Sequence, residues 1–253
     1  MKVRVIVATL GERKSLESCF ESIKNQELSE IEVVIVTPLD SHGKVDQIAK
    51  HILKSNYQII EDSGKGLSAA INQGFEVEGE FKYFCWLNDD DELTAGSLKR
   101  SILELDSNQN YSAVVGTLKY RLEKSNKVIL NKVSKLKLVV SEFGPNLIPQ
   151  PGSLIRKNKI DTSLLNRDYK YAMDLDLFLR LKSKGKIGVI KEIQAVLNYD
   201  LHTITLNNRS KATNEAFHIR MLNSRNIFFK LLNLIFYIPT LFLMSIIKYL
   251  IKS

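Results

Sequence analysis

The sequence has few cysteines, and none of them forms a metal-binding or redox pair. Its 253 residues contain only Cys19 and Cys85, far apart and each in an apolar context. Without a CxxC pair, a cysteine zinc site is not indicated, and buried free thiols of a reducing compartment are expected. The N-terminal stretch MKVRVIVATL has too short an apolar run for a signal peptide. We therefore expect the body of the protein to remain in the cytosol.

Glycine-rich phosphate-binding motifs are also missing. The first apolar run is followed by TLGER and not by GxGxxG, and the Gly-Lys pairs at 43–44 and 64–65 lack the other residues of a P-loop. No GxSxG elbow occurs. Dinucleotide oxidoreductases, P-loop NTPases and hydrolases with a Ser/His/Asp triad are therefore disfavoured.

What the first hundred residues do contain is an alternation of buried strands and amphipathic helices. A hydrophobic content of 44% and a charged content of 25% are typical of a globular protein. VRVIVATL, IEVVIV, YQII and YFCWL predict strands buried on both faces, and apolar residues recur at helical spacing between them. This order predicts an α/β fold with a mostly parallel, doubly wound sheet and helices on both faces.

The regular alternation of predicted strands and helices becomes less clear after Ala113. AVVGTLKY, KVILN and GSLIRK predict further strands, a strong helix starts at about Asp174, and IGVIKEIQAVLNY predicts a long last strand.

An acidic run, NDDDEL, follows the fourth predicted strand. Adjacent carboxylates repel one another, so we expect the run to make an interaction that offsets this repulsion. One interpretation is an acidic turn that caps the next helix, and the other is a site for a divalent cation. Ligands of doubly wound sheets bind beyond the carboxyl ends of the strands, which supports the cation site. Glu92 is expected to start the next helix.

The segment YAMDLDLFLRL holds two further carboxylates. On a helix, Asp176 and Arg180 are four residues apart, which predicts an exposed ion pair. Asp174 falls on the same stripe as Phe178 and Leu181, near the helix start. A carboxylate at such a buried edge is either a helix cap or a residue with a direct functional role.

The C-terminal residues are basic and apolar. Residues 206–253 carry a net charge of +6 out of the total of +8, and residues 231–247 are uncharged. Seventeen residues are at the lower limit for a membrane-spanning helix, so a single span, an interfacial helix and a helix packed on the body are alternatives. Basic residues before the run would place the body on the cytoplasmic side. Because charges alternate with aliphatic runs and not with exposed aromatics, we expect a membrane partner and no nucleic acid.

Six segments in this order resemble the family 2 glycosyltransferases of bacterial polysaccharide and surface-glycan synthesis: VIVATLGERKSLESCFESIKNQ, KGLSAAINQGF, WLNDDDEL, PQPGSLIRK, YAMDLDLFLRL and YDLH. The resemblance implies the GT-A fold of nucleotide-diphospho-sugar transferases. It covers about Val3 to His202. We expect a glycosyltransferase domain (1–205), with a nucleotide-binding half (1–100) and an acceptor half (101–205), and a basic, hydrophobic, membrane-associating helical tail (206–253) that the charge and hydropathy indicate.

The resemblance also implies roles for matched residues. Asp91 would bind Mg²⁺ or Mn²⁺, helped by His202, and Asp174 would be the general base. Gln150 and Pro151 would lie on the acceptor side. Contacts to the donor would come from Thr9, Asp40, Lys65, Gly66, Asn72, Asn88, Asp89 and Asp90.

The sequence departs from the family pattern after the second strand. Thr37 and Pro38 stand where the family has an acidic pair that contacts the nucleotide, and Asp40 is the candidate replacement. The basic residue common near the closing histidine is also absent, since Asp200 and Leu206 occupy that neighbourhood.

The implied function is metal-dependent, inverting transfer of a sugar from a nucleotide diphosphate to a glycan acceptor. UDP is the first expectation for the nucleotide, with dTDP and GDP as alternatives. The tail suggests a polyprenyl-diphosphate-linked acceptor, at the cytoplasmic face of a membrane. A cation would stabilise the leaving diphosphate, and one carboxylate would accept the proton of the attacking hydroxyl. A second hypothesis is a catalytically silent, membrane-bound partner in a glycan assembly complex, because the acidic pair is missing.

Overall fold

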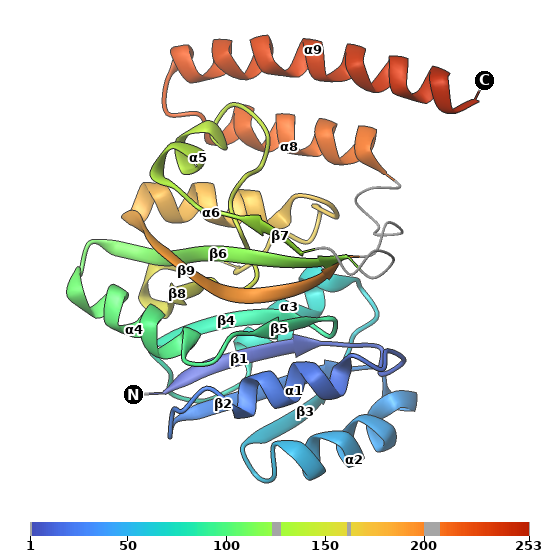
Figure 1. Cartoon of the computed structure of the whole chain (residues 1–253), viewed down its shortest axis with the longest axis vertical. Helices are drawn as coiled ribbons and strands as arrows, with labels where there is room; N and C mark the ends of the chain where they lie inside the picture. Colours follow the sequence, from blue (N-terminus) through green and yellow to red (C-terminus); the bar gives the residue numbers. More distant parts are fainter. Residues whose placement is uncertain (1, 123–127, 161–162, 200–207, 253) are drawn as a thin grey trace.

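The computed structural model describes residues 2–122, 128–160, 163–199 and 208–252. In these residues nine strands form one twisted sheet with helices on both of its faces (Figure 1). The strand order is β3-β2-β1-β4-β8-β6-β9-β5, and β7 pairs with β6.

The first half is the predicted parallel sheet. Strands β1 (Val3–Ala8), β2 (Ile31–Thr37), β3 (Tyr57–Glu61) and β4 (Tyr83–Asn88) alternate with helices α1 (Leu16–Lys24), α2 (His42–Ile52) and α3 (Leu67–Glu76). Strand β1 pairs in parallel with both β2 and β4, and β2 with β3. The order of elements expected from the β-branched runs is therefore confirmed.

The second half makes the sheet mixed. It contains β5 (Asp91–Leu93), α4 (Ser97–Ser107), β6 (Tyr111–Leu122), β7 (Val128–Asn131), α5 (Lys135–Val140), β8 (Leu154–Arg156), α6 (Met173–Lys184) and β9 (Lys186–Tyr199). Strand β8 is antiparallel to β4 and β6, and β5 is antiparallel to β9. Only β6 and β9 pair in parallel here. The expectation of a mostly parallel sheet is therefore confirmed, with the antiparallel pairings of the described residues confined to strands β5, β7 and β8.

Two apolar layers sandwich the sheet. Helices α1, α2 and α4 cover one face, where Cys19 and Cys85 are buried as free thiols. Helices α3 and α6 cover the other. Burial raises the pKa of both thiols, so they act as small apolar side chains, as expected from their sequence context.

Two C-terminal helices complete the chain, α8 (Arg209–Asn223) and α9 (Ile227–Lys252), and α9 is the outermost layer in Figure 1. Leu175 and Leu179 of α6 pack against Ala216 and Ile219 of α8. Helix α9 packs on α8: Phe217 and Tyr237 stack at 4.0 Å, and buried Asn233 donates to the Phe217 carbonyl.

This packing matches one of the three alternatives for the tail, a helix held on the body. In the part of the chain that the structure describes, no helix has the length and apolar character needed to cross a bilayer.

Gly74 allows α3 to approach the sheet closely. A Cβ atom at this position would lie 2.6 Å from Ile6 Cγ2. We expect Gly74→Ala to destabilise the protein, because overpacking costs about 1–3 kcal/mol and exceeds the gain in helix propensity of up to about 1 kcal/mol. Gly43→Ala in α2 is the matched control, since a Cβ there meets nothing within 4 Å. Urea unfolding compares the two, and an equal or higher stability of Gly74→Ala would contradict the packing argument.

Candidate active site

The functional residues gather at one edge of the sheet. Parallel strands β1 and β4 both end there, at Ala8 and Asn88. Helix α6 is followed directly, after Gly185, by β9, which runs back in the opposite direction. The start of α6 therefore lies at the edge of the sheet where β9 ends (Figure 1). The edge thus brings together the loop after β1, the acidic run and the start of α6.

Side chains of the loop after β1 hold two of the aspartates. Thr9 Oγ1 donates to Asp89 Oδ2 at 2.7 Å. The Arg13 guanidinium lies 2.8 Å from Asp89 Oδ1 and 2.6 Å from Asp90 Oδ2. Arg13 therefore offsets the repulsion between these carboxylates. Thr9 itself is buried, and its Oγ1 also accepts the Gly11 backbone N–H.

Asp91 is stabilised differently. It is only 3% exposed, and its Oδ2 accepts a hydrogen bond of 3.0 Å from the Asn88 amide. Burial, followed by the nearby charge of Asp90, raises the pKa of Asp91 to about 8. At neutral pH this carboxyl is therefore largely protonated in the metal-free protein.

Glu92 does not start the next helix, contrary to the sequence-based expectation. It lies in β5 opposite Val196 of β9 and pairs with Arg121 of β6 at 3.0 Å. Helix α4 begins only at Ser97, with Gly96 at its N-cap. The interpretation of the acidic run as a helix cap is wrong, because the chain returns to the sheet first.

Asp174 is the second residue of α6 and is half-buried. Its Oδ1 accepts the Leu175 backbone N–H at 2.8 Å, and its Oδ2 accepts the Asn146 amide at 3.3 Å. Burial raises the pKa of Asp174 in spite of these hydrogen bonds. The N-cap position is Ala172. Asp174 is thus no N-cap residue, and a raised pKa makes its carboxylate a better proton acceptor.

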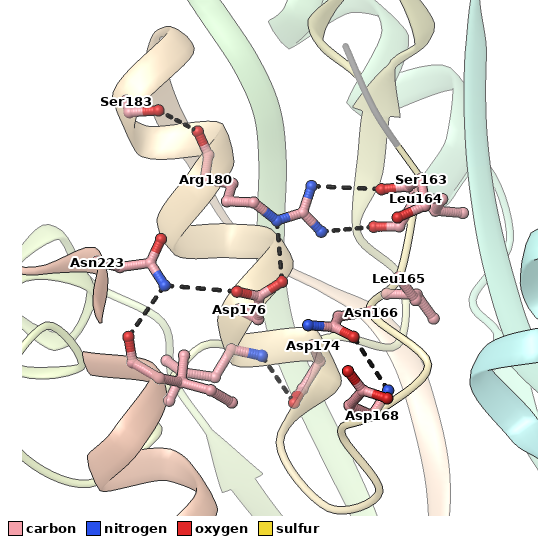
Figure 2. Close-up of polar contacts among 12 residues, drawn as sticks. Ser163, Leu164, Leu165, Asn166, Asp168, Asp174, Asp176, Arg180, Ser183 and Asn223 are labelled. Carbon is pink, nitrogen blue, oxygen red and sulfur yellow. Dashed lines mark hydrogen bonds and ion pairs between the residues drawn. The ribbon is translucent and has the colours of Figure 1, made fainter. Parts of the chain in front are cut away.

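Asp176 forms the predicted ion pair with Arg180, 2.9 Å apart, but the pair is not exposed. The Asp176 side chain is buried, and Arg180 also donates to the carbonyls of Ser163 and Leu164 (Figure 2). The pair therefore ties α6 to the segment that precedes it.

The remaining donor-side residues lie beyond the ends of β2 and β3. Asp40 is exposed in a 3₁₀ turn, Leu39–Ser41, directly after β2. Lys65 is exposed, and Gly66 begins α3 with a φ of 92° that favours glycine. Among the described side chains, Thr37 carries the buried polar atom without a hydrogen-bond partner, its Oγ1.

Asn72 has a different position from the one expected. It is completely buried, and its amide donates to the Leu165 carbonyl and accepts the Leu165 N–H, both at 2.8 Å. Asn72 therefore presents no side-chain surface to a nucleotide and instead holds the Leu165 backbone.

Gln150 and Pro151 lie next to the end of β4, since Gln150 Nε2 donates to the Trp86 carbonyl at 3.1 Å. Both are buried, and Gly152 makes the turn into β8 with a φ of 72°. His202 lies outside the described residues.

Comparison with known proteins decides the family. The model of glycosyl transferase family 2 matches residues 4–172, about two thirds of the chain. The chain belongs to glycosyl transferase family 2. It is therefore a glycosyltransferase, as the six segments indicated.

Relatives of this glycosyltransferase agree with the assignment. GalNAc(5)-diNAcBac-PP-undecaprenol beta-1,3-glucosyltransferase of Campylobacter jejuni is 24% identical over 217 residues, which cover 81% of this chain and 67% of that protein. Putative glycosyltransferase EpsH of Bacillus subtilis is 30% identical over 84 residues, 32% of this chain and 24% of that one.

Solved structures share the fold. S. aureus TarS (1–349) in complex with UDP-GlcNAc matches with a TM-score of 0.70 and 16% identity, over 93% of this chain and 71% of that one. The UDP complex of the same fragment has a TM-score of 0.67, 16% identity and coverages of 93% and 70%. The glycosyltransferase therefore has a GT-A-like α/β fold.

The described side chains of the glycosyltransferase do not by themselves form a complete cation site. Within the described residues, no three His, Cys, Asp or Glu side chains come close enough to hold a metal ion together. Mg²⁺ is commonly held by one or two carboxylates together with phosphate oxygens and water. The side chain of Asp90 is 32% exposed, whereas Asp91 is 3% exposed. Accessibility therefore favours Asp90 over Asp91, the ligand that the resemblance implied.

Two polar contacts of the glycosyltransferase site were not expected from sequence. Arg13 bridges Asp89 and Asp90, and Asn198 at the end of β9 donates to the Asp90 carbonyl at 2.9 Å. A basic residue in the loop after a first buried strand could have drawn attention to Arg13. Asn198 carries no such local signal, because its position follows from the pairing of β9 with β5.

The raised pKa of Asp91 predicts a pH-dependent stability. In the unfolded chain this carboxyl ionises near its ordinary pKa, so folding takes up a proton between about pH 4 and pH 8 and the folded state loses stability as pH rises through this window. In metal-free protein we expect Asp91→Asn to remove this loss, which is on the order of 1–3 kcal/mol between pH 5.5 and 8.5. Urea unfolding at both values measures it. A loss of the same size in wild type and Asp91→Asn would contradict the assignment.

Proposed function

We propose that this glycosyltransferase transfers a sugar, with inversion, from a uridine-diphosphate donor to a lipid-linked glycan in bacterial surface-polysaccharide synthesis. One observation carries the proposal: the donor-side acids and the half-buried Asp174 lie on different elements of one sheet edge. We propose that the donor diphosphate binds at the acids and that the acceptor hydroxyl binds at Asp174.

The donor side consists of Thr9, Arg13 and the acids that they hold. A guanidinium already 2.6 Å from Asp90 is placed to turn to an incoming diphosphate, for which its planar fork is well suited. The TarS complexes with UDP and UDP-GlcNAc support uridine as the nucleotide of a protein with the same fold. Asp40, Lys65 and Gly66 border this site beyond β2 and β3.

The chemistry on the acceptor side requires one base. We propose that Asp174 accepts the proton of the attacking acceptor hydroxyl as the new glycosidic bond forms and the bond to the nucleotide diphosphate breaks. Attack from the side opposite the leaving group inverts the anomeric carbon, and no covalent enzyme nucleophile takes part. Burial raises the pKa of Asp174, which increases its basicity.

The donor set supports a divalent cation, Mg²⁺ or Mn²⁺, held by Asp90 together with the diphosphate. When bound, the cation would act as a Lewis acid that stabilises charge on the leaving group. Arg13, which pairs with both Asp89 and Asp90, would contribute a further positive charge beside the diphosphate.

Support for the acceptor class comes from the C. jejuni relative, whose name describes an undecaprenol-linked oligosaccharide. We therefore propose a polyprenyl-diphosphate-linked glycan as the acceptor. We propose that the segment of Gln150 and Pro151, next to the end of β4, lies on the acceptor side.

We further propose that the protein works at the cytoplasmic surface of a membrane, through the first half of α9. Its exposed apolar residues follow a helical stripe and are 51–70% exposed: Ile227, Phe228, Leu231, Ile235 and Ile238. Arg225 lies just before the stripe with a side chain 57% exposed, and Lys230 lies within it. An apolar stripe flanked by cations fits an interfacial helix on anionic lipid.

Substitution of Asp174 tests the proposed function. With UDP-sugars, Mn²⁺ and polyprenyl-diphosphate-linked acceptors, we expect Asp174→Asn to lower kcat by about 10²-fold or more, because the proton acceptor is lost. UDP and Mn²⁺ should still raise its Tm. Asp90→Asn should instead abolish that rise in Tm, whereas Asp46→Asn on the outer side of α2 is the matched control. Turnover of Asp174→Asn at the wild-type rate would refute the base assignment.

The membrane proposal predicts binding to vesicles. Leu231→Glu should weaken co-sedimentation with phosphatidylglycerol vesicles by about tenfold or more, since burial of one leucine is worth about 1.5–3 kcal/mol. Leu103→Glu in α4, another exposed leucine, serves as control. Equal binding of both variants would show that α9 does not make the contact.

A further inference from the structure

Glu215 of α8 accepts three backbone hydrogen bonds from one short segment. Its Oε1 lies 2.7 Å from the backbone nitrogens of both Tyr171 and Ala172, and its Oε2 lies 3.0 Å from that of Lys170. It is also the one acid among residues 206–253, where basic residues predominate. A carboxylate with three such bonds is a strong constraint, because hydrogen bonds to charged groups are worth more than neutral ones.

The segment held by Glu215 leads directly into Asp174. Ala172 is the N-cap of α6, and its side chain cannot accept a hydrogen bond. The free N–H groups at the start of a helix need acceptors, and a negative charge is favourable there. From a neighbouring helix, Glu215 accepts the N–H of the N-cap residue, two residues before Asp174, and places a carboxylate at the start of α6. Its other two donors lie just before the helix.

Packing around the carboxylate reinforces the same contact. Ala216, next to Glu215, and Ile219 one turn later are buried against Ala172 and Leu175. Helix α8 therefore holds the residues on either side of Asp174 in two ways: its apolar side chains pack against them, and its Glu215 carboxylate accepts their backbone hydrogen bonds on the Lys170–Ala172 side.

Other side chains hold the earlier part of this loop. Ser68 donates to the Tyr169 carbonyl at 3.3 Å, Arg180 to the Leu164 carbonyl at 2.7 Å, and Asn72 pairs with Leu165 (Figure 2 shows the Arg180 contacts). These residues belong to α3 and α6. Among the side-chain hydrogen bonds of the described residues, those to the last three residues before α6 come from α8.

We propose that Glu215 is a positioning residue for Asp174: by fixing the Lys170–Ala172 backbone it sets where the base carboxylate meets the acceptor hydroxyl. The inference rests on the proposed function of Asp174. Helix α8 lies beyond residues 4–172, the region that matches the family model. The inference gives this helix a role in positioning the base. Displacement of a reacting group by about 1 Å can cost about 10²-fold in rate, so the constraint has kinetic consequences.

Four variants of the full chain, assayed for kcat and for the KM of the donor, test the inference. Glu215→Ala removes all three acceptors and should lower kcat by about tenfold or more, with the donor KM changed by less than about threefold. Glu215→Gln keeps one amide oxygen for Tyr171 and Ala172 and should recover most of kcat. Asn223→Ala is the matched control, since Asn223 joins α8 to Asp176 of α6 at 3.4 Å without touching the loop. Asp174→Asn reports on the base.

Each result decides the question. A wild-type kcat in Glu215→Ala, or an equal loss in Asn223→Ala, would overturn the inference and leave ordinary helix packing. Should Glu215→Ala fail to fold by circular dichroism, Glu215→Asp, which withdraws the carboxylate by one methylene, is compared with Glu215→Gln. Equal kcat values in those two would also overturn it. An active Asp174→Asn would instead refute the proposed base, whereas an inactive Asp174→Asn beside an unaffected Glu215→Ala refutes only the positioning role.

Discussion

The structure depends on how three consecutive carboxylates are accommodated at the end of a buried strand. Asp89 and Asp90 are balanced by Arg13, Asp89 also receives the Thr9 hydroxyl, and Asp91 is buried against Asn88. These partners can meet only because β1 and β4 are neighbours that end in register. The parallel pairing of two strands eighty residues apart thus makes the acidic cluster stable enough to serve a ligand.

On the opposite side of the site, side-chain hydrogen bonds to backbone groups hold the structure in place, and charge balance is not involved. Residues 163–172 contain little regular structure, and they are held by side chains of α3, α6 and α8 that bind their carbonyl and amide groups. Buried backbone groups without partners are costly, so these side chains fix the loop. The position of Asp174 depends on that loop, because the loop leads directly into α6. The position of a carboxylate in the first turn of a helix therefore depends on the segment before that helix.

Local sequence patterns predicted the first half of the fold because each strand and helix there is a continuous run with one clear period. In the second half, GSLIRK was predicted as a strand and contains β8, whereas β5 was not predicted, since its three residues form a strand only by pairing with distant β9. Glu92 shows the difficulty: its neighbours suggest a helix start, yet pairing with β9 places it in the sheet. Asp176 shows the same for burial, because its ion pair with Arg180 was predictable while its cover by α8 was not.

Residue order and spacing were enough to indicate the family, the alternation of strands and helices, the position of the acidic run beyond β4 and the candidate base. Four other features follow from tertiary contacts alone: which carboxylates are accessible, that Arg13 lies between Asp89 and Asp90, that Asn72 is buried, and that Glu215 reaches the start of α6. Each of these is a contact between segments far apart in the chain. Such contacts are set by packing, and packing leaves no periodic trace in the sequence.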